Sequence, residues 1–161
     1  MKKYQGMYCL ALAVLILTAV GCTQKKKPDG LPDLYPLTIK LVYDDGTAVE
    51  GASVQIISTD TSATQRWNTS GKTDAQGQAV MRTYGEYPGA PIGNYKVIAN
   101  KEEITYDNSD PPQITGRFNR IEKKYNTIQG TDLTLEVKPD TKSVELNVGK
   151  AVREIMAGPP G

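Results

Sequence analysis

Seven short segments in which apolar and polar residues alternate are the feature that most constrains the fold of this chain. In the first, Leu37, Ile39 and Leu41 share one face, and Thr38 and Lys40 lie opposite. The others lie at 53–56, 67–73, 78–84, 95–99, 133–137 and 143–148. A two-residue period is typical of a strand with one buried face, and such faces must pack together in pairs. The sequence therefore predicts an all-β fold, an antiparallel β-sandwich of about seven strands.

Turn signals separate these segments and set the bounds of the domain. Asp44-Asp45-Gly46, Asp74-Ala75-Gln76-Gly77 and Pro139-Asp140 are each typical of tight turns between strands. We expect the sandwich to occupy residues 36–149, with a short helical turn or an irregular loop at 121–128. Residues 150–161 are predicted to be a flexible tail, briefly helical at 151–157.

The first 21 residues have the pattern of a targeting segment. Two lysines at the start precede a 14-residue apolar run, Met7–Val20, which is shorter than the roughly 20 residues that span a membrane. The sequence that follows, Ala19-Val20-Gly21-Cys22, resembles a bacterial lipobox, although Ala19 stands where leucine is usual. The resemblance implies cleavage before Cys22 and lipidation, including palmitate, of its side chain and new terminus. The alternative is an ordinary secretory signal cleaved near Gly21, with Cys22 left as a free thiol.

Cysteine usage and the next segment agree with an exported, anchored protein. Cys9 lies in the apolar run, so after cleavage Cys22 has no partner for a disulfide. Residues 22–35 are predicted to be a tether, in which Lys25–Lys27 either contact anionic headgroups or form a solvated spacer. By resemblance to Gram-negative sorting, Thr23 rather than aspartate after the cysteine favours the outer membrane over the inner one. The expected location is the cell envelope.

Three further motifs occur in order along the predicted sandwich. Val49-Glu50-Gly51-Ala52-Ser53-Val54, Thr73-Asp74-Ala75-Gln76-Gly77 and Pro91-Ile92-Gly93-Asn94-Tyr95-Lys96-Val97 resemble the V-x-G-A-x-V, T-D-x-x-G and P-x-G-x-Y-x-V motifs of carboxypeptidase-regulatory-like domains. Lys124-Tyr125 and residues 133–139 resemble the closing strands of the same group. The chain resembles a transthyretin-like lipoprotein of the kind common in planctomycetes. The resemblance implies a transthyretin-like, Ig-like sandwich that is structural or interacts with other molecules rather than catalysing a reaction.

Each motif residue has a predicted structural role. Gly51 permits the turn before Ala52, and Asp74 accepts backbone amides ahead of it while Gly77 supplies a positive φ. Gly93 lets the chain pass from a proline-containing loop into a strand. Tyr95 is expected to be buried, with its hydroxyl bonded to the backbone. The loop 85–93 is not expected to form a regular ladder, because its prolines lack amide donors.

Composition excludes several function classes. The chain has no histidine, which excludes Ser-His-Asp and Cys-His catalysis and histidine-ligated metals, and we expect no enzyme activity, cofactor or metal. A formal net charge of +1 gives no basis for a nucleic-acid partner. The oxygens of Asp107, Asn108, Ser109 and Asp110 favour a solvated turn, with weak calcium binding as the alternative.

Aromatic residues near predicted loops are the remaining candidates for binding. Trp67, Tyr84 and Tyr87 are the candidate binding surface, and Tyr106 and Tyr125 are further aromatic residues of this kind. The alternative is that Trp67 and Tyr84 cover the edge of the core. We expect a lipid-anchored envelope module that contacts the membrane through its lipid and interacts with an envelope protein. The alternative is a carbohydrate-binding module on the cell surface, which would require exposed, coplanar aromatic rings on one sheet face.

Overall fold

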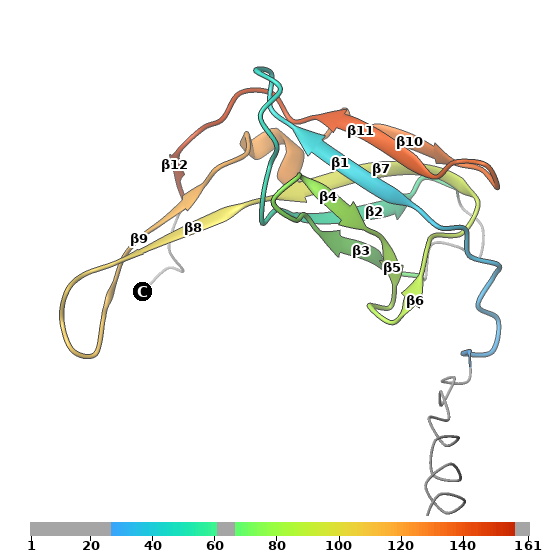
Figure 1. Cartoon of the computed structure of the whole chain (residues 1–161), viewed down its shortest axis with the longest axis horizontal. Coiled ribbons are helices and arrows are strands. Elements are labelled where there is room, and N and C mark those ends of the chain that lie inside the picture. Colours follow the sequence, from blue (N-terminus) through green and yellow to red (C-terminus); the bar gives the residue numbers. More distant parts are fainter. Residues whose placement is uncertain (1–26, 61–66, 157–161) are drawn as a thin grey trace, which may run out of the picture. The chain divides into compact units, whose positions relative to one another are not determined.

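The computed structural model describes residues 27–60 and 67–156. The chain divides into two compact units, residues 1–31 and 32–161. Of the first, the described part contains a turn closed by the Leu31 amide, which donates to the Pro28 carbonyl at 3.1 Å. The second unit contains the strands described below (Figure 1).

Two sheets form the sandwich. The smaller has the order β11-β1-β4, from β1 (Thr38–Val42), β4 (Gln78–Val80) and β11 (Ser143–Asn147). The larger has the order β10-β7-β2-β3-β5-β6. Its strands are β2 (Ser53–Ser58), β3 (Thr69–Lys72), β5 (Arg82–Thr83), β6 (Tyr87–Pro88), β7 (Gly93–Asn100) and β10 (Thr134–Val137). The seven predicted strand segments are all present, and the predicted all-β sandwich is confirmed.

The core lies between the apolar faces that the alternation predicts. Ile39 and Leu41 of β1 have no exposed surface, and Val54 and Ile56 of β2 are 1% and 2% exposed. From β7, the alternate residues Tyr95, Val97 and Ala99 join the same cluster. Because every second side chain of these strands is buried, a shift of one residue in any register would expose the core face.

One pairing departs from the antiparallel prediction. β1 and β11 pair in parallel, with Ile39 opposite Val144 and Leu41 opposite Leu146. Strands of opposite direction can be joined by a tight hairpin, whereas this pair brings together segments about a hundred residues apart in sequence. The alternation specifies which side chains point inward, but it does not specify which strand lies alongside, so the direction was not predictable from it.

The segment 78–88 passes from one sheet to the other. β4 pairs with β1, and β5, which follows after Met81, pairs with β3. β5 then pairs with β6, with Thr83 opposite Tyr87. The expectation that loop 85–93 has no ladder is therefore wrong at residues 87–88. Pro88 is accommodated because β6 is the edge strand, where a missing amide costs no ladder bond.

A hairpin that the sequence analysis did not predict extends from the sandwich (Figure 1). It consists of β8 (Glu102–Tyr106) and β9 (Ile114–Asn119), and β12 (Glu154–Ile155) pairs with β9 to give the sheet order β12-β9-β8. We call these three strands the arm. The brief helix expected at 151–157 is not formed in the described part, since Glu154 and Ile155 pair with Asn119 and Phe118. Ladder bonds to β9 hold this segment extended.

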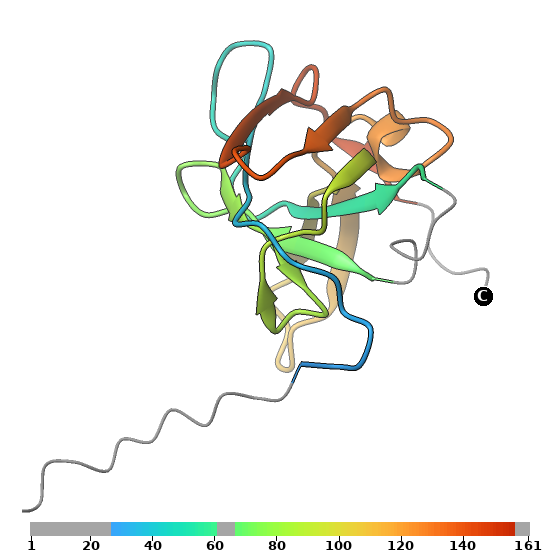
Figure 2. The same ribbon diagram turned by 90° about the vertical axis from the view of Figure 1, so that its right-hand side faces the viewer.

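A single turn of 3₁₀ helix, η2 (Lys123–Asn126), follows β9 and lies beside β7 (Figure 2). It agrees with the short helical turn expected at 121–128. Its one buried residue is Tyr125, which is 4% exposed and joins the core cluster. The turn thus contributes an aromatic side chain to the core.

Candidate binding surfaces

Cys22, the predicted lipidation site, lies outside the described residues. Within residues 27–60 and 67–156, no helix has the length and apolar character needed to cross a membrane.

Two of the family-like motifs meet at one buried hydroxyl group. Thr73 is 4% exposed, and its Oγ1 donates to the Val49 carbonyl at 2.6 Å and accepts the Ala52 amide at 2.7 Å. The Gly51 amide donates to the Thr73 carbonyl at 3.0 Å, and Gly51 has a φ of 73°. Thr73 therefore fixes the turn before β2, and the role expected of Gly51 in that turn fits its positive φ.

Asp74 and Gly77 form the turn before β4 in the way the sequence suggests. Asp74 Oδ1 accepts the amides of Gln76 at 2.9 Å and Gln78 at 2.8 Å. Gly77 has a φ of 76°, and a Cβ there would lie 2.6 Å from the Leu41 carbonyl oxygen. The turn must pass this close because the Gly77 carbonyl accepts the Leu41 amide at 2.9 Å. These residues tie the turn to β1.

The contacts of Gly93 and Tyr95 also indicate structural roles. Gly93 has a φ of 153°, and a Cβ there would lie 3.1 Å from Asp60 Oδ2. Tyr95 is 3% exposed, and its hydroxyl donates to the Pro91 carbonyl at 2.9 Å, as expected. Burial, and secondarily the Asp60 carboxylate, raises the pKa of Tyr95 to about 12. A phenol held neutral in this way is a structural anchor.

The predicted aromatic candidates do lie near one another. Trp67 and Tyr84 meet edge to face, with ring centroids 5.2 Å apart and planes 76° apart. Trp67 is only 7% exposed, whereas Tyr84 is 48% exposed. Tyr87 is half-buried on β6. Because Trp67 is buried and the two rings are nearly perpendicular, this pair does not form a flat platform for a sugar ring.

Tyr84 adopts a costly backbone conformation at the tip between β5 and β6. Its φ is 54°, and Gly85 follows with a φ of 70°. Two successive positive φ values are what a type I′ hairpin turn needs, and asparagine or glycine usually supplies them. The left-handed conformation costs a residue with a Cβ about 1–2 kcal/mol. Tertiary contacts rather than local preference therefore hold Tyr84, among them the Trp67 ring and the bond from its amide to the Asn68 carbonyl at 2.8 Å.

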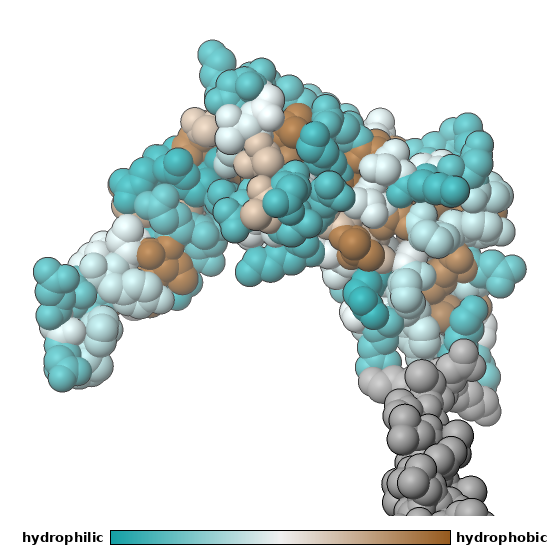
Figure 3. Space-filling view, viewed as in Figure 1, coloured by the Kyte–Doolittle hydropathy of each residue, from teal (hydrophilic) through white to brown (hydrophobic). Residues whose placement is uncertain are grey.

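The arm carries a second group of exposed side chains, of which the sequence analysis named only Tyr106. Ile104, Tyr106 and Ile114 are 37%, 57% and 49% exposed. Ile114 stands opposite Tyr106, so the three side chains share one face of the hairpin. Figure 3 shows hydrophobic surface on the otherwise polar arm. The available signal was the β-branched and aromatic residues on both sides of the Asp107–Pro112 turn.

The opposite face of the arm carries paired charges. Arg153 lies over the Phe118 ring at 3.5 Å from its centroid, and its Nε donates to Glu103 at 3.0 Å. Arg120 is 3.4 Å from the same carboxylate. These contacts join Glu103 of β8 and Phe118 of β9 to Arg153, which directly precedes β12.

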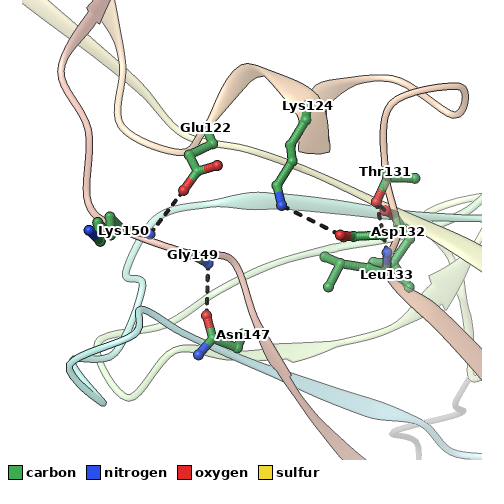
Figure 4. Close-up of polar contacts among 9 residues, drawn as sticks. Glu122, Lys124, Thr131, Asp132, Leu133, Asn147, Gly149 and Lys150 are labelled. Carbon is green, nitrogen blue, oxygen red and sulfur yellow. Dashed lines mark hydrogen bonds and ion pairs between the residues drawn. The ribbon is translucent and has the colours of Figure 1, made fainter.

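Contacts at the base connect the arm to the sandwich. The Tyr43 hydroxyl donates to the Arg120 carbonyl at 3.0 Å, and the Arg120 amide donates to the Lys101 carbonyl at 2.8 Å. In Figure 4, Glu122 accepts the Lys150 amide at 3.2 Å. The Gly149 carbonyl accepts the Asp44 amide at 2.9 Å. The Tyr43 hydroxyl thus ties the end of β9 to the sandwich, and Glu122 ties the loop after β9 to the segment that leads to β12.

The tip of the hairpin is closed by Asp107. Its Oδ1 accepts the amides of Ser109 at 3.1 Å and Gln113 at 2.8 Å, and the Ser109 hydroxyl also donates to it. These hydrogen bonds lower the pKa of Asp107, and the bond from the Ser109 hydroxyl has the largest effect. Within the described part of the chain, no group of three or more acidic or cysteine side chains could hold a metal ion. The geometry fits the solvated turn better than the calcium alternative.

Comparisons with known proteins give distant likenesses of fold. No protein-family model matches the chain, and no curated protein sequence matches it. The major pilin subunit BcpA of Bacillus cereus matches with a TM-score of 0.38 and 11% identity, over 76% of this chain and 30% of the pilin. A 9R-lipoxygenase from Cyanothece PCC8801 matches with a TM-score of 0.35 and 13% identity, over 81% of this chain and 18% of the lipoxygenase. The chain spans less than a third of the length of either structure.

Proposed function

We propose that this chain is a lipid-anchored lipoprotein of the cell envelope whose non-catalytic β-sandwich serves a structural or protein-interaction role. The observation that carries the interaction role is the arm, which presents exposed apolar side chains and an edge strand away from the sandwich core. The anchor is supported by the apolar run Met7–Val20 and the Ala-Val-Gly-Cys sequence that ends at Cys22.

Relatedness to transthyretin-like lipoproteins is part of the same proposal. Its support is that the motif residues make the contacts their spacing suggests, with Thr73 bonded to Val49 and Ala52. The non-catalytic role is supported by the absence of histidine from the chain and by the structural surroundings of Asp74, Gly77 and Tyr95. The carbohydrate-binding alternative is disfavoured by the burial of Trp67.

Metabolic labelling with a palmitate analogue tests the anchor. The wild-type chain should incorporate label and fractionate with membranes, and Cys22→Ser should lose both properties. Cys9→Ser is the matched control, because that residue lies in the segment that is removed. A wild-type chain that incorporates no label would contradict the anchor and leave the secretory alternative.

Site-specific photo-crosslinking in intact cells tests the interaction role of the arm. A photoreactive amino acid at Tyr106 should give discrete crosslinked species. The same residue at Val80, which is 59% exposed on β4, should give none. Equal crosslinking from the two positions would contradict a specific role for the arm.

A further inference from the structure

Within residues 27–60 and 67–156, no strand pairs with the outer edge of β8. β8 is the last strand in the order β12-β9-β8. The Lys101 carbonyl and the Asp107 amide bond to Arg120 and Gln113, on the β9 side. Because successive residues of a strand direct their main-chain groups to opposite sides, the amides and carbonyls of Glu102, Ile104 and Tyr106 point away from β9.

Proline and a bulge, two of the usual protections of an edge strand, are absent from β8. Natural proteins block such edges with proline, with bulges or with charged side chains. β8 contains no proline, and its register with β9 passes from Thr105–Gly116 to Tyr106–Ile114, which places the extra residue in β9. Its acidic residues remain charged and form ion pairs within the arm, Glu102 with Arg117 at 3.6 Å and Glu103 with Arg120 and Arg153.

We propose that two copies of this chain pair antiparallel through β8, with Ile104 of one copy opposite Ile104 of the other. This inference rests on the interaction role proposed for the arm and names its partner. In this register Glu102 stands opposite Tyr106, so the outward main-chain groups of both strands meet. The two three-stranded arms then form one continuous sheet.

Charge selects this register over its neighbours. Centring the pair on Ile104 places Lys101 opposite Asp107 at both ends, and neither residue takes part in an ion pair within residues 27–60 and 67–156. A shift toward residue 103 places Glu103 opposite Glu103. A shift toward residue 105 places Glu103 opposite Asp107. Like charges directly opposite each other destabilise a strand pair, and opposite charges stabilise it.

The same register joins the exposed apolar side chains. Ile104, Tyr106 and Ile114 lie on one face of the hairpin, and pairing places the two Ile104 side chains side by side at the axis. The apolar surfaces of the two arms therefore become one patch on one face of the joined sheet. A two-fold pair of this kind is self-complementary and closes, which limits it to a dimer.

Cysteine crosslinking tests the register in the full-length chain, purified in detergent with Cys9→Ser and Cys22→Ser so that one introduced thiol is the only one. Directly opposed residues have Cα atoms about 5.5 Å apart, within disulfide range. Ile104→Cys should therefore form a covalent dimer under mild oxidation. Tyr106→Cys is the matched control, because its symmetry mate lies about four residues along the ladder, roughly 13 Å away.

A proline variant tests the pairing without a thiol. Ile104→Pro removes an amide that points away from β9, so the hairpin keeps its own ladder while the dimer loses its central bonds. In sedimentation, the thiol-free chain should be a dimer and Ile104→Pro a monomer with an unchanged far-ultraviolet spectrum. The pairing is overturned if the thiol-free chain is a monomer. It is also overturned if Ile104→Cys and Tyr106→Cys crosslink equally. If photo-crosslinks from Tyr106 still reach another protein in that case, the interaction role stands and only self-pairing fails.

Discussion

The hydroxyl of Thr73 donates to the Val49 carbonyl across 24 residues of sequence, at 2.6 Å. It also accepts the Ala52 amide, so one buried side chain satisfies two main-chain groups of the turn that leads into β2. Valine has nearly the same shape as threonine, with a methyl group in place of the hydroxyl. Because a buried polar group without a partner costs about 1–3 kcal/mol, replacing Thr73 by valine measures the penalty of leaving these two main-chain groups unpaired.

We expect Thr73→Val to lower the free energy of unfolding by about 2–4 kcal/mol, since both the Val49 carbonyl and the Ala52 amide lose their partner. Urea denaturation measures this loss. Thr134→Val, at an exposed position of β10, is the matched control and should change stability by less than about 0.5 kcal/mol. Equal losses at the two positions would show that the hydroxyl bonds do not secure the turn.

Two glycines with the same backbone conformation separate strain from steric contact. Gly46 and Gly77 have φ values of 80° and 76°, but a Cβ at Gly46 would meet no atom within 4 Å. Gly46→Ala should cost only the left-handed conformation, about 1–2 kcal/mol. Gly77→Ala should cost clearly more, because its Cβ meets the Leu41 carbonyl oxygen. Thermal unfolding of both variants checks the order, and a reversed order would contradict the close approach.

Two tyrosines on the consecutive strands β6 and β7 should differ in how much they contribute to stability. Tyr95 is 3% exposed in the core, whereas Tyr87 is half-buried on the edge strand β6. Tyr95→Ala should lower the free energy of unfolding by about 3–5 kcal/mol. Tyr87→Ala should lower it by less, as urea denaturation would show. A larger loss at Tyr87 would mean that the edge, not the core, dominates here.

Alkaline conditions should destabilise the fold in part through Tyr95. Its pKa is raised from 10.0 to about 12, mainly by burial. Between these two values the unfolded chain releases the phenolic proton and the folded chain keeps it, so stability falls as the pH rises. Tyr95→Phe should remove this contribution and give a shallower decline from pH 10 to 12. Identical slopes would show that Tyr95 ionises equally in both states.

Chelation should leave the fold unchanged. Asp107 Oδ1 already accepts hydrogen bonds from the Ser109 and Gln113 amides. These bonds close the tip of the hairpin without a metal ion. Thermal unfolding with EDTA, and with added calcium, should give the same midpoint as without either. A midpoint that falls with chelator and rises with calcium would restore the calcium interpretation of Asp107 and Asp110.

The strands and turns of the sandwich could be predicted from local patterns in the sequence alone. Alternation in β1 identified Ile39 and Leu41 as buried, and turn chemistry placed Asp74 and Gly77 correctly. Both succeed because one buried face imposes a two-residue period, and because a turn is made by adjacent residues.

Only the tertiary structure decided the features that no local sequence pattern indicates. The parallel pairing of β1 with β11 depends on how distant segments pack, and Trp67 is buried by its surroundings rather than by a pattern of its own. The arm was missed because solvent reaches both of its faces, so β8 has no buried side to impose alternation. Its strands are specified instead by ladder bonds to each other and to β12, which exist only once the chain has folded.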